Sequence, residues 1–207
     1  MGITETAVPD AYRIRPRLRE DSRGNFYESY RYDELARETG HVFAPRQANY
    51  SVSARGTLRG LHGVTIPPGQ AKFVTCVRGA LLDVVVDVRL GSPTFGAYDT
   101  TVLDASEGTA VYVAEGLAHG FVALTDDSCV SYLCSTQFVP GTQFEIQPFD
   151  AELDLPWGQA LTGPALLSEK DRRAPGLAAA ADLGVLATYE ECRKLYERAR
   201  RDASDAY

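Results

Sequence analysis

The sequence predicts a mainly β protein, arranged as a sandwich or a jelly-roll barrel, with short peripheral helices and a C-terminal helix. Two observations support this fold class. Between about residues 47 and 150, apolar runs of strand length alternate with the turn signals "RG", "GSP", "EG" and "DD". After about residue 165 helical patterns replace them. At 207 residues we expect one domain over 1–207, with a β core at about 47–150 and a helical appendage at about 165–207.

The individual elements follow from local patterns, taken in chain order. The segment "YRYDELARETG" has helical spacing and ends at Gly40, the residue type favoured after a helix. The segments "AKFVTCV" and "ALLDVVVDVRL", joined by "RG", predict a β-hairpin, and "AVYV", "GFVAL" and "CVSYLC" predict further short strands. In "TYEECRKLYERARRDA", Thr188 and Glu191 stand in capping-box register at the start of a helix that we expect to pack on the outside.

Composition narrows the possible functions. A net charge of −7 argues against general binding to nucleic acid or to a membrane surface, so an anionic ligand requires a local basic pocket. The first residues, "MGITETAVPDAYRI", lack the cationic and apolar regions of a signal peptide, and no long apolar run predicts a membrane span. The four cysteines are scattered and form no CxxC pair, as is typical of reduced thiols. We therefore expect a cytoplasmic protein.

Two of the three histidines are candidates for one site. His62 in "RGLHG" and His119 in "EGLAHGF" are flanked by glycine within the strand region, whereas His41 follows a predicted helix end and is expected at the surface. Arg59 and Lys72, on either side of His62, would disfavour the protonated imidazole, which suits a base that is neutral near pH 7. The alternative is that each histidine is a core or hairpin residue whose ring is satisfied by a backbone carbonyl.

A metal centre is not expected. Jelly-roll proteins that bind a transition metal usually supply two histidines one residue apart on a strand, with a carboxylate nearby. Here Gly63 and Val64 follow His62, and Lys72 would repel a divalent cation. The sequence therefore predicts a site without metal or other cofactor.

Three further residues remain ambiguous from their spacing alone. Lys72 lies on a predicted strand, and an inward position would require an anionic partner, so an inward and a solvated outward position are left open. Tyr132 in "CVSYLC" is compatible with a core aromatic whose hydroxyl is satisfied. Asp171 stands among other charges in "LLSEKDRRAP", a pattern typical of a solvated loop.

Taken together, several separated motifs resemble the dTDP-4-dehydrorhamnose 3,5-epimerase family. They are "EDSRGNFYES", "RGLHG", "QAKFVTCVRGALLDVVVDVRLGSPTFG", "EGLAHGF" and "LSEKDRRAP", which occur in the family's order from about residue 21 to 175. The resemblance implies a cupin double-stranded β-helix (jelly roll), a metal-free site, a dTDP-linked 4-keto-6-deoxyhexose substrate, and a homodimer.

The resemblance also implies roles for individual residues. His62 corresponds to the general base, Asp171 to the carboxylate that orients it, and Tyr132 to the acid on the opposite face of the sugar. Lys72 corresponds to the lysine that holds the C4 oxygen. The remaining implied residues are Arg59 and His119 in the same pocket, Asp83 behind His119, Gln47 and Asn49 facing substrate, Phe138 as the thymine-stacking aromatic, and Arg23, Phe26 and Glu28 on an arm that enters the partner subunit's site.

This sequence departs from the family's pattern at two places. Gly63 follows His62 where the family usually has a large residue, which implies a pocket that is wider or is shaped for another sugar. The segment after Tyr132 lacks the family's paired tyrosines, which is more similar to the antibiotic-sugar branch, whose members epimerise C3, C5 or both.

The chemistry of such an epimerisation fits these residues. Removing a proton from carbon next to a ketone at neutral pH needs an aimed base and a cation on the forming oxyanion, and inversion needs an acid on the other face. Arginines suit the diphosphate of a nucleotide sugar. Two alternatives remain: a ketoisomerase that moves the carbonyl between C3 and C4, and a non-catalytic sugar-nucleotide-binding cupin.

Overall fold

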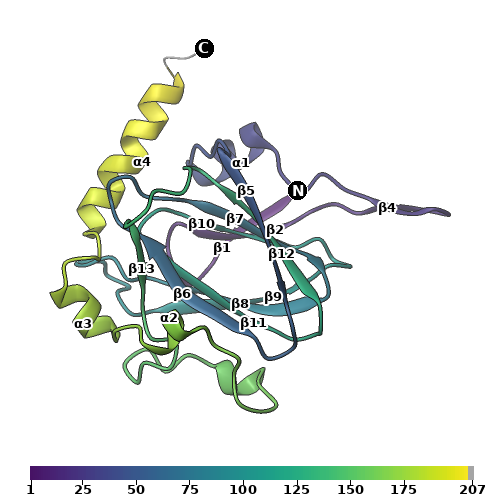
Figure 1. The fold of residues 1–207 in the computed structure, drawn as a ribbon. Helices are drawn as coiled ribbons and strands as arrows, with labels where there is room; N and C mark the ends of the chain where they lie inside the picture. Colours follow the sequence, from purple (N-terminus) through teal and green to yellow (C-terminus); the bar gives the residue numbers. More distant parts are fainter. Residues whose placement is uncertain (205–207) are drawn as a thin grey trace.

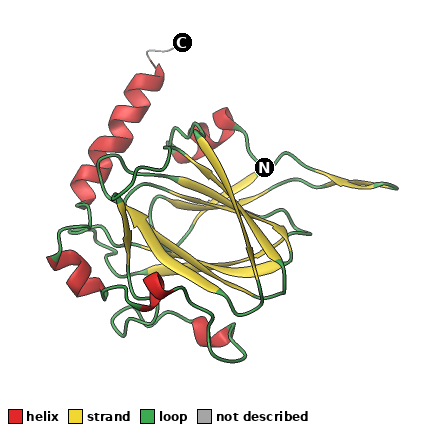
Figure 2. Cartoon of the chain, viewed as in Figure 1, coloured by secondary structure: helices red, strands yellow, loops and turns green. Residues whose placement is uncertain are grey.

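Two antiparallel sheets face each other and form the walls of a barrel in the computed structural model, which describes residues 1–204 (Figures 1 and 2). The six-stranded sheet has the order β1 (Gly2–Glu5), β2 (Ala11–Arg15), β10 (Ala110–Val113), β7 (Lys72–Arg78), β12 (Ser128–Cys134), β5 (Gln47–Ser53). The five-stranded sheet has the order β13 (Gln143–Glu145), β6 (Leu58–Val64), β11 (Ala118–Ala123), β8 (Ala80–Val86), β9 (Tyr98–Asp104). The predicted mainly β, jelly-roll class is confirmed.

Helices and a β-ribbon lie outside the two sheets. The ribbon pairs β3 (Arg19–Asp21) with β4 (Gly24–Phe26) and projects away from the barrel as an arm (Figure 1). The helices are α1 (Tyr32–Thr39), the 3₁₀ turn η1 (Trp157–Gln159), α2 (Glu169–Arg172), α3 (Leu177–Asp182) and α4 (Tyr189–Ser204). Within residues 1–204, no helix has both the length and the apolar character needed to cross a membrane.

The β core begins earlier than the predicted residue 47. Strands β1 and β2 form one end of the six-stranded sheet, where β1 pairs with β2 and β2 pairs with β10. The sequence pattern misses them because β1 is an edge strand that is largely exposed, and β2 buries only Ala11 and Ile14 fully. Such short strands carry too few apolar residues to show a period of two.

The predicted hairpin of β7 and β8 is wrong. The two strands are joined at Gly79 but belong to different sheets: β7 pairs with β10 and β12, and β8 pairs with β9 and β11. Both strands are buried along most of their length, so their apolar pattern carries no information about which neighbour they pair with. Gly79 makes the crossing possible, because its φ is +77° and a Cβ there would lie 2.2 Å from Thr125 Oγ1.

The C-terminal third of the chain covers the outer face of the five-stranded sheet. Trp157 and Leu177 pack there against Leu61, Val84 and other residues of β6, β8 and β11. Trp157 is 1% exposed, and its indole nitrogen donates a hydrogen bond of 2.7 Å to the Pro148 carbonyl. Burying such a side chain contributes on the order of 2 to 3 kcal/mol. This segment is therefore part of the core, and it fixes where α2 begins.

The helix ends agree with the sequence. Gly40 ends α1 in the left-handed conformation, with φ of 72°. At the start of α4, the Thr188 hydroxyl accepts from the Glu191 amide, and the Thr188 amide donates to the Glu191 carboxylate. The predicted capping box is confirmed, although the last residues of the predicted appendage, 205–207, lie outside the described residues.

The prediction that His41 is exposed is wrong. Its side chain is nearly buried, with Nε2 3.0 Å from Asp10 Oδ1 and its ring centroid 4.6 Å from that of Tyr196. A local pattern around one residue cannot show that β2 and the distant helix α4 cover it. The ring is part of the packing that holds α4 on the barrel.

We expect Gly63→Ala to lower the free energy of unfolding by about 1 to 3 kcal/mol, the usual cost of overpacking. A Cβ at Gly63 would lie 2.1 Å from Cζ of Phe144, whose ring is nearly buried on the paired strand β13. Urea denaturation measures the change. Gly163→Ala is the matched control, because a Cβ there meets no atom within 4 Å. Equal stability of the two variants would contradict the packing described.

Candidate active site

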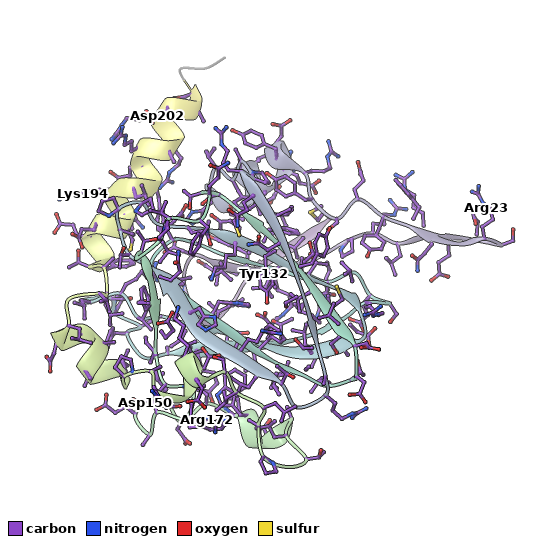
Figure 3. All side chains as sticks on the ribbon, viewed as in Figure 1. Arg23, Tyr132, Asp150, Arg172, Lys194 and Asp202 are labelled. Atoms are coloured by element: carbon purple, nitrogen blue, oxygen red, sulfur yellow. The ribbon has the colours of Figure 1, made fainter. Side chains whose placement is uncertain are left out.

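A cavity of about 400 Å³ opens between the two sheets. Tyr132 lies at the centre of the barrel in the view of Figure 3. The cavity is lined by most of the residues that the sequence singled out: Gln47, Asn49, Arg59, His62, Lys72, His119, Tyr132, Phe138 and Asp171. Asp83 lies directly behind His119.

One wall of the cavity is the inner face of the six-stranded sheet. On β5, Gln47, Asn49 and Ser51 alternate along the strand and therefore share a face. On β12, Tyr132 is paired with Asn49, while Cys134 is paired with Gln47 on one side and Lys72 on the other. The register of three neighbouring strands thus brings the lysine and the tyrosine to the same wall.

The opposite wall is the five-stranded sheet. His62 on β6 and His119 on β11 are directly paired across the two strands, so their rings lie side by side on the inner face. Arg59 reaches the same cavity from β6. The two histidines that the sequence groups as candidates for one site thus lie together in one cavity.

Each of the two histidines has its own carboxylate. His62 Nε2 lies 2.6 Å from Asp171 Oδ1, and His119 Nε2 lies 2.5 Å from Asp83 Oδ2. The His119–Asp83 pair is buried, whereas the His62 side chain is 37% exposed to the cavity. The sequence places His62 between two cationic residues, Arg59 and Lys72, but the group that contacts its ring directly is the carboxylate of Asp171.

Asp171 is held in place by the start of α2. Its amide donates to the hydroxyl of Ser168, the residue that caps the helix. Burial acts to raise the pKa of Asp171, but hydrogen bonds from His62 and Ser168 outweigh it and hold the pKa below its ordinary value of 3.8. Asp171 is therefore an ionised partner for His62 and not the solvated loop residue that its sequence context suggests.

Lys72 points into the cavity, which decides between the two positions that the sequence left open. Its Nζ lies 3.5 Å from the His62 carbonyl oxygen. Burial lowers the pKa of Lys72, and the nearby Cys134 and Asp83 partly offset this effect. The ammonium group is positioned to meet an oxygen atom of a ligand between the two walls.

Tyr132 presents its hydroxyl to the same cavity. The hydroxyl lies 3.4 Å from Ser51 Oγ, and the ring contacts His119 edge-on at 6.2 Å between centroids. Burial raises the pKa of Tyr132 well above its ordinary value. The phenol is thus protonated at neutral pH and can act as a proton donor.

The cavity rim carries a cation and an aromatic ring. Arg59 Nε donates to Ser53 Oγ at 3.1 Å, which ties the guanidinium to the edge strand β5. Phe138 is 60% exposed, and its amide donates to Gln47 Oε1 at 2.7 Å. Both groups are accessible to a ligand that extends out of the cavity.

The three predicted arm residues are not in this cavity. Arg23 lies at the far end of the projecting arm, where its only charged partner within residues 1–204 is Asp21 (Figure 3). Phe26 and Glu28 line a small hollow at the base of the arm instead. In a single chain, therefore, the arm cannot contribute to the site.

The structure adds residues that the sequence did not single out. Ser51 and Cys134 line the cavity beside Tyr132 and Lys72, and Glu145 forms an ion pair with Lys170 on the other side. Gln47 and Asn49 were implied by the resemblance, and alternation along the same strand could have indicated Ser51 as the next inward residue. Glu145 gave no such signal, because its strand has only three residues.

No metal centre is formed by these groups. In the described part of the chain, no cluster of three or more histidine, cysteine or acidic side chains could hold a metal ion.

The comparisons with known proteins agree with this geometry. The family model described as "dTDP-4-dehydrorhamnose 3,5-epimerase" matches residues 5–179. A Mycolicibacterium smegmatis dTDP-4-dehydrorhamnose 3,5-epimerase is 46% identical over 202 residues, 98% of each chain. A Streptomyces bikiniensis dTDP-4-dehydro-6-deoxyglucose 3-epimerase is 45% identical, over 89% of this chain and 93% of the other.

Two solved structures of epimerases are also similar to this chain. A Mycobacterium tuberculosis epimerase superposes with a TM-score of 0.93 at 42% identity, over 96% of this chain and 100% of that one. The 3'-monoepimerase of Streptomyces bikiniensis in complex with dTDP-quinovose has a TM-score of 0.87 at 43% identity, over 92% and 96% of the two chains.

The fold and the comparisons define an isomerase with a cupin-like jelly roll, in which His62 and Tyr132 line a cavity from opposite sheets. The chain belongs to the dTDP-4-dehydrorhamnose 3,5-epimerase family, and it is an epimerase.

We expect Asp171→Asn to lower the free energy of unfolding by about 1.5 to 3 kcal/mol at pH 7, the range for a hydrogen bond to a charged group. Because the folded-state pKa of Asp171 lies below the unfolded value of 3.8, its contribution is present above pH 3.8 and is lost as the pH falls through the folded-state pKa. Denaturation of the variant and of the unmodified protein, at pH 7 and at about pH 3, measures the difference in the free energy of unfolding at each pH.

Glu169→Gln is the matched control on the same helix. The Glu169 side chain is 71% exposed and its ion pairs are on the surface, so its loss should change stability little at either pH. A penalty for Asp171→Asn that persists undiminished at low pH would contradict an ionised Asp171.

Proposed function

We propose that the protein inverts a dTDP-linked 4-keto-6-deoxyhexose at C3, C5 or both, by removing a proton from one face of the sugar and returning one to the other. The observation that carries this proposal is the position of His62 and Tyr132 on opposite sheets of the barrel. A ketohexose ring held between the two walls exposes one face to a base and the other face to an acid. Both 3,5-epimerases and 3-epimerases are among the relatives, so C3 is the centre that their activities share.

His62 is the proposed base. Nε2 faces Asp171, which leaves the other ring nitrogen to take the proton from the carbon next to the C4 ketone. The carboxylate fixes the orientation of the ring and stabilises the imidazolium that forms. Nothing in this step requires a metal or an organic cofactor.

Lys72 is the proposed partner of the oxyanion. When the carbon–hydrogen bond breaks, negative charge moves to the C4 oxygen, and an ammonium group already fixed in the cavity stabilises that charge without reorganisation. The same interaction is present as the proton returns, so Lys72 acts in both directions. His119, supported by Asp83, lies beside it as a second polar group for the sugar.

Tyr132 is the proposed acid. Its hydroxyl comes from the six-stranded sheet, while His62 comes from the five-stranded sheet. A proton delivered from that side produces the inverted centre, whereas one returned by His62 restores the substrate. The division of labour between the two residues therefore decides between inversion and simple exchange.

The nucleotide would lie along the cavity rim. Arg59 is placed to pair with diphosphate oxygens, and the exposed ring of Phe138 offers a stacking surface for thymine. Gln47 and Asn49 supply amide groups between these two positions. A local basic rim explains how a protein with a net charge of −7 can bind a dianionic ligand.

The proposed enzyme is a homodimer in which each arm completes the partner's site. The arm projects away from its own barrel, and it carries an arginine, an aromatic ring and a carboxylate: Arg23, Phe26 and Glu28. An isolated ribbon of two strands is only marginally stable, so a second copy is the expected support for it. We place the enzyme in the cytoplasm, where its four free thiols would remain reduced.

We expect three substitutions to separate exchange from inversion. In deuterated water, His62→Asn should reduce both deuterium wash-in and inversion by about 10² to 10⁴, the scale for loss of a positioned base. Lys72→Ala should also depress both, because the oxyanion is then not stabilised. Tyr132→Phe should retain wash-in while inversion falls. NMR of a dTDP-4-keto-6-deoxyglucose incubation, read at C3 and C5, gives both rates, and normal inversion by Tyr132→Phe would refute the assignment of the acid.

We expect mixed dimers of His62→Asn and Arg23→Ala subunits to recover activity. If the arm acts in the partner's site, one of the two sites in each mixed dimer has both an intact His62 and an intact Arg23. If the arm acts in the site of its own subunit, neither of the two sites has both residues intact. Dimers purified with two different affinity tags should reach about half of the wild-type turnover, and activity no higher than that of either parent variant would rule out arm exchange.

A further inference from the structure

An epimerisation that uses one residue as base and another as acid leaves neither residue in the protonation state that it had at the start. After one inversion, His62 holds the proton taken from the sugar, and Tyr132 has lost the proton that it gave. His62 faces the open cavity and can release its proton to water, because its side chain is 37% exposed. Tyr132 must recover a proton before the next inversion, and burial makes its phenolate a strong base.

The Tyr132 hydroxyl has one hydrogen-bond partner within residues 1–204. That partner is Ser51 Oγ at 3.4 Å. The titratable groups that influence Tyr132 from other positions are Asp83 on β8, Arg59 on β6 and Cys134 on its own strand, and none of the three forms a hydrogen bond with the hydroxyl. Among the described residues, Ser51 is therefore the side chain that can pass a proton directly to the tyrosine.

Ser51 also stands where solvent can reach it. It lies on β5, the last strand of its sheet, its side chain is half-buried, and it lines the open cavity. The register places it diagonally opposite Tyr132, on the same inward face. A serine hydroxyl can donate one hydrogen bond while it accepts another, which a relay requires.

We propose that Ser51 is a proton relay that resets Tyr132 after each inversion. The Ser51 hydroxyl gives its proton to the Tyr132 phenolate and takes one from water or a buffer acid, while His62 releases its proton to solvent, so protons balance over the cycle. Ser51 acts through Tyr132 and does not itself touch the reacting carbon. The inference rests on the proposed roles of His62 and Tyr132 and adds the step that makes their reaction repeatable.

The relay predicts that the Ser51→Ala enzyme forms inverted product in a burst, with a fast first turnover followed by a slower steady state. The first inversion uses the proton already on Tyr132, so single-turnover inversion with excess enzyme should stay within about twofold of the wild-type rate. Later turnovers wait for the slow reset, so steady-state inversion should fall by about 10-fold to 100-fold, up to the lower end of the range for a lost acid–base group. Deuterium wash-in through His62 and binding of dTDP should not change.

Two further measurements separate the relay from a purely structural role. Ser51→Thr keeps the hydroxyl and should restore steady-state inversion, and added imidazole at pH 7 should accelerate Ser51→Ala because its cation supplies protons directly. Ser131→Ala is the matched control, since Ser131 is on β12 next to Tyr132 in sequence and faces the other side of the sheet. That control should behave as wild type.

The outcomes distinguish this inference from the proposed function. Equal losses of Ser51→Ala in single-turnover inversion, wash-in and dTDP affinity would mean that Ser51 only binds substrate, and unchanged steady-state inversion would mean that it is not needed. Either result overturns the relay while leaving Tyr132 as the acid. If Tyr132→Phe itself inverts at the wild-type rate, the proposed function fails first.

Discussion

The contact on which the site depends is the 2.6 Å hydrogen bond between His62 and Asp171, two residues that are 109 positions apart. His62 comes from the middle of a central strand, and Asp171 from a four-residue helix that could not persist on its own. The helix is held because the preceding segment packs on the outer face of the five-stranded sheet around Trp157. Packing on the outside of the barrel thus sets the position of the carboxylate that orients His62, the proposed base, on the inside.

The two walls of the cavity differ in how they are supported. His62 and His119 lie on neighbouring strands within a sheet that is covered by the C-terminal segment. Ser51 and Asn49 lie on β5, which is paired on one side only. The proposed base therefore lies on a wall whose outer face is covered, whereas the proposed relay Ser51 lies on the open edge of the other wall, next to the strand that carries Tyr132.

Much of this organisation can be predicted from the sequence, and the failures have physical causes. The β class, Gly40, the capping box at Thr188 and the shared position of His62 and His119 follow from local patterns or from motifs. The strands with which β7 and β8 pair could not be predicted, because strands buried on both faces carry no alternation to indicate a partner. Asp171 was ambiguous for a related reason: whether a charged loop is solvated depends on what the rest of the chain places beneath it.

The contact between Gly63 and Phe144 also bears on the space available beside the site. The resemblance implied a wider pocket at Gly63, but the space that a side chain would take is filled from β13 by the ring of Phe144. One volume is shared by two positions that are distant in the sequence. A larger residue after His62 therefore fits only if the residue at position 144 is smaller, so the missing side chain at Gly63 does not by itself enlarge the cavity.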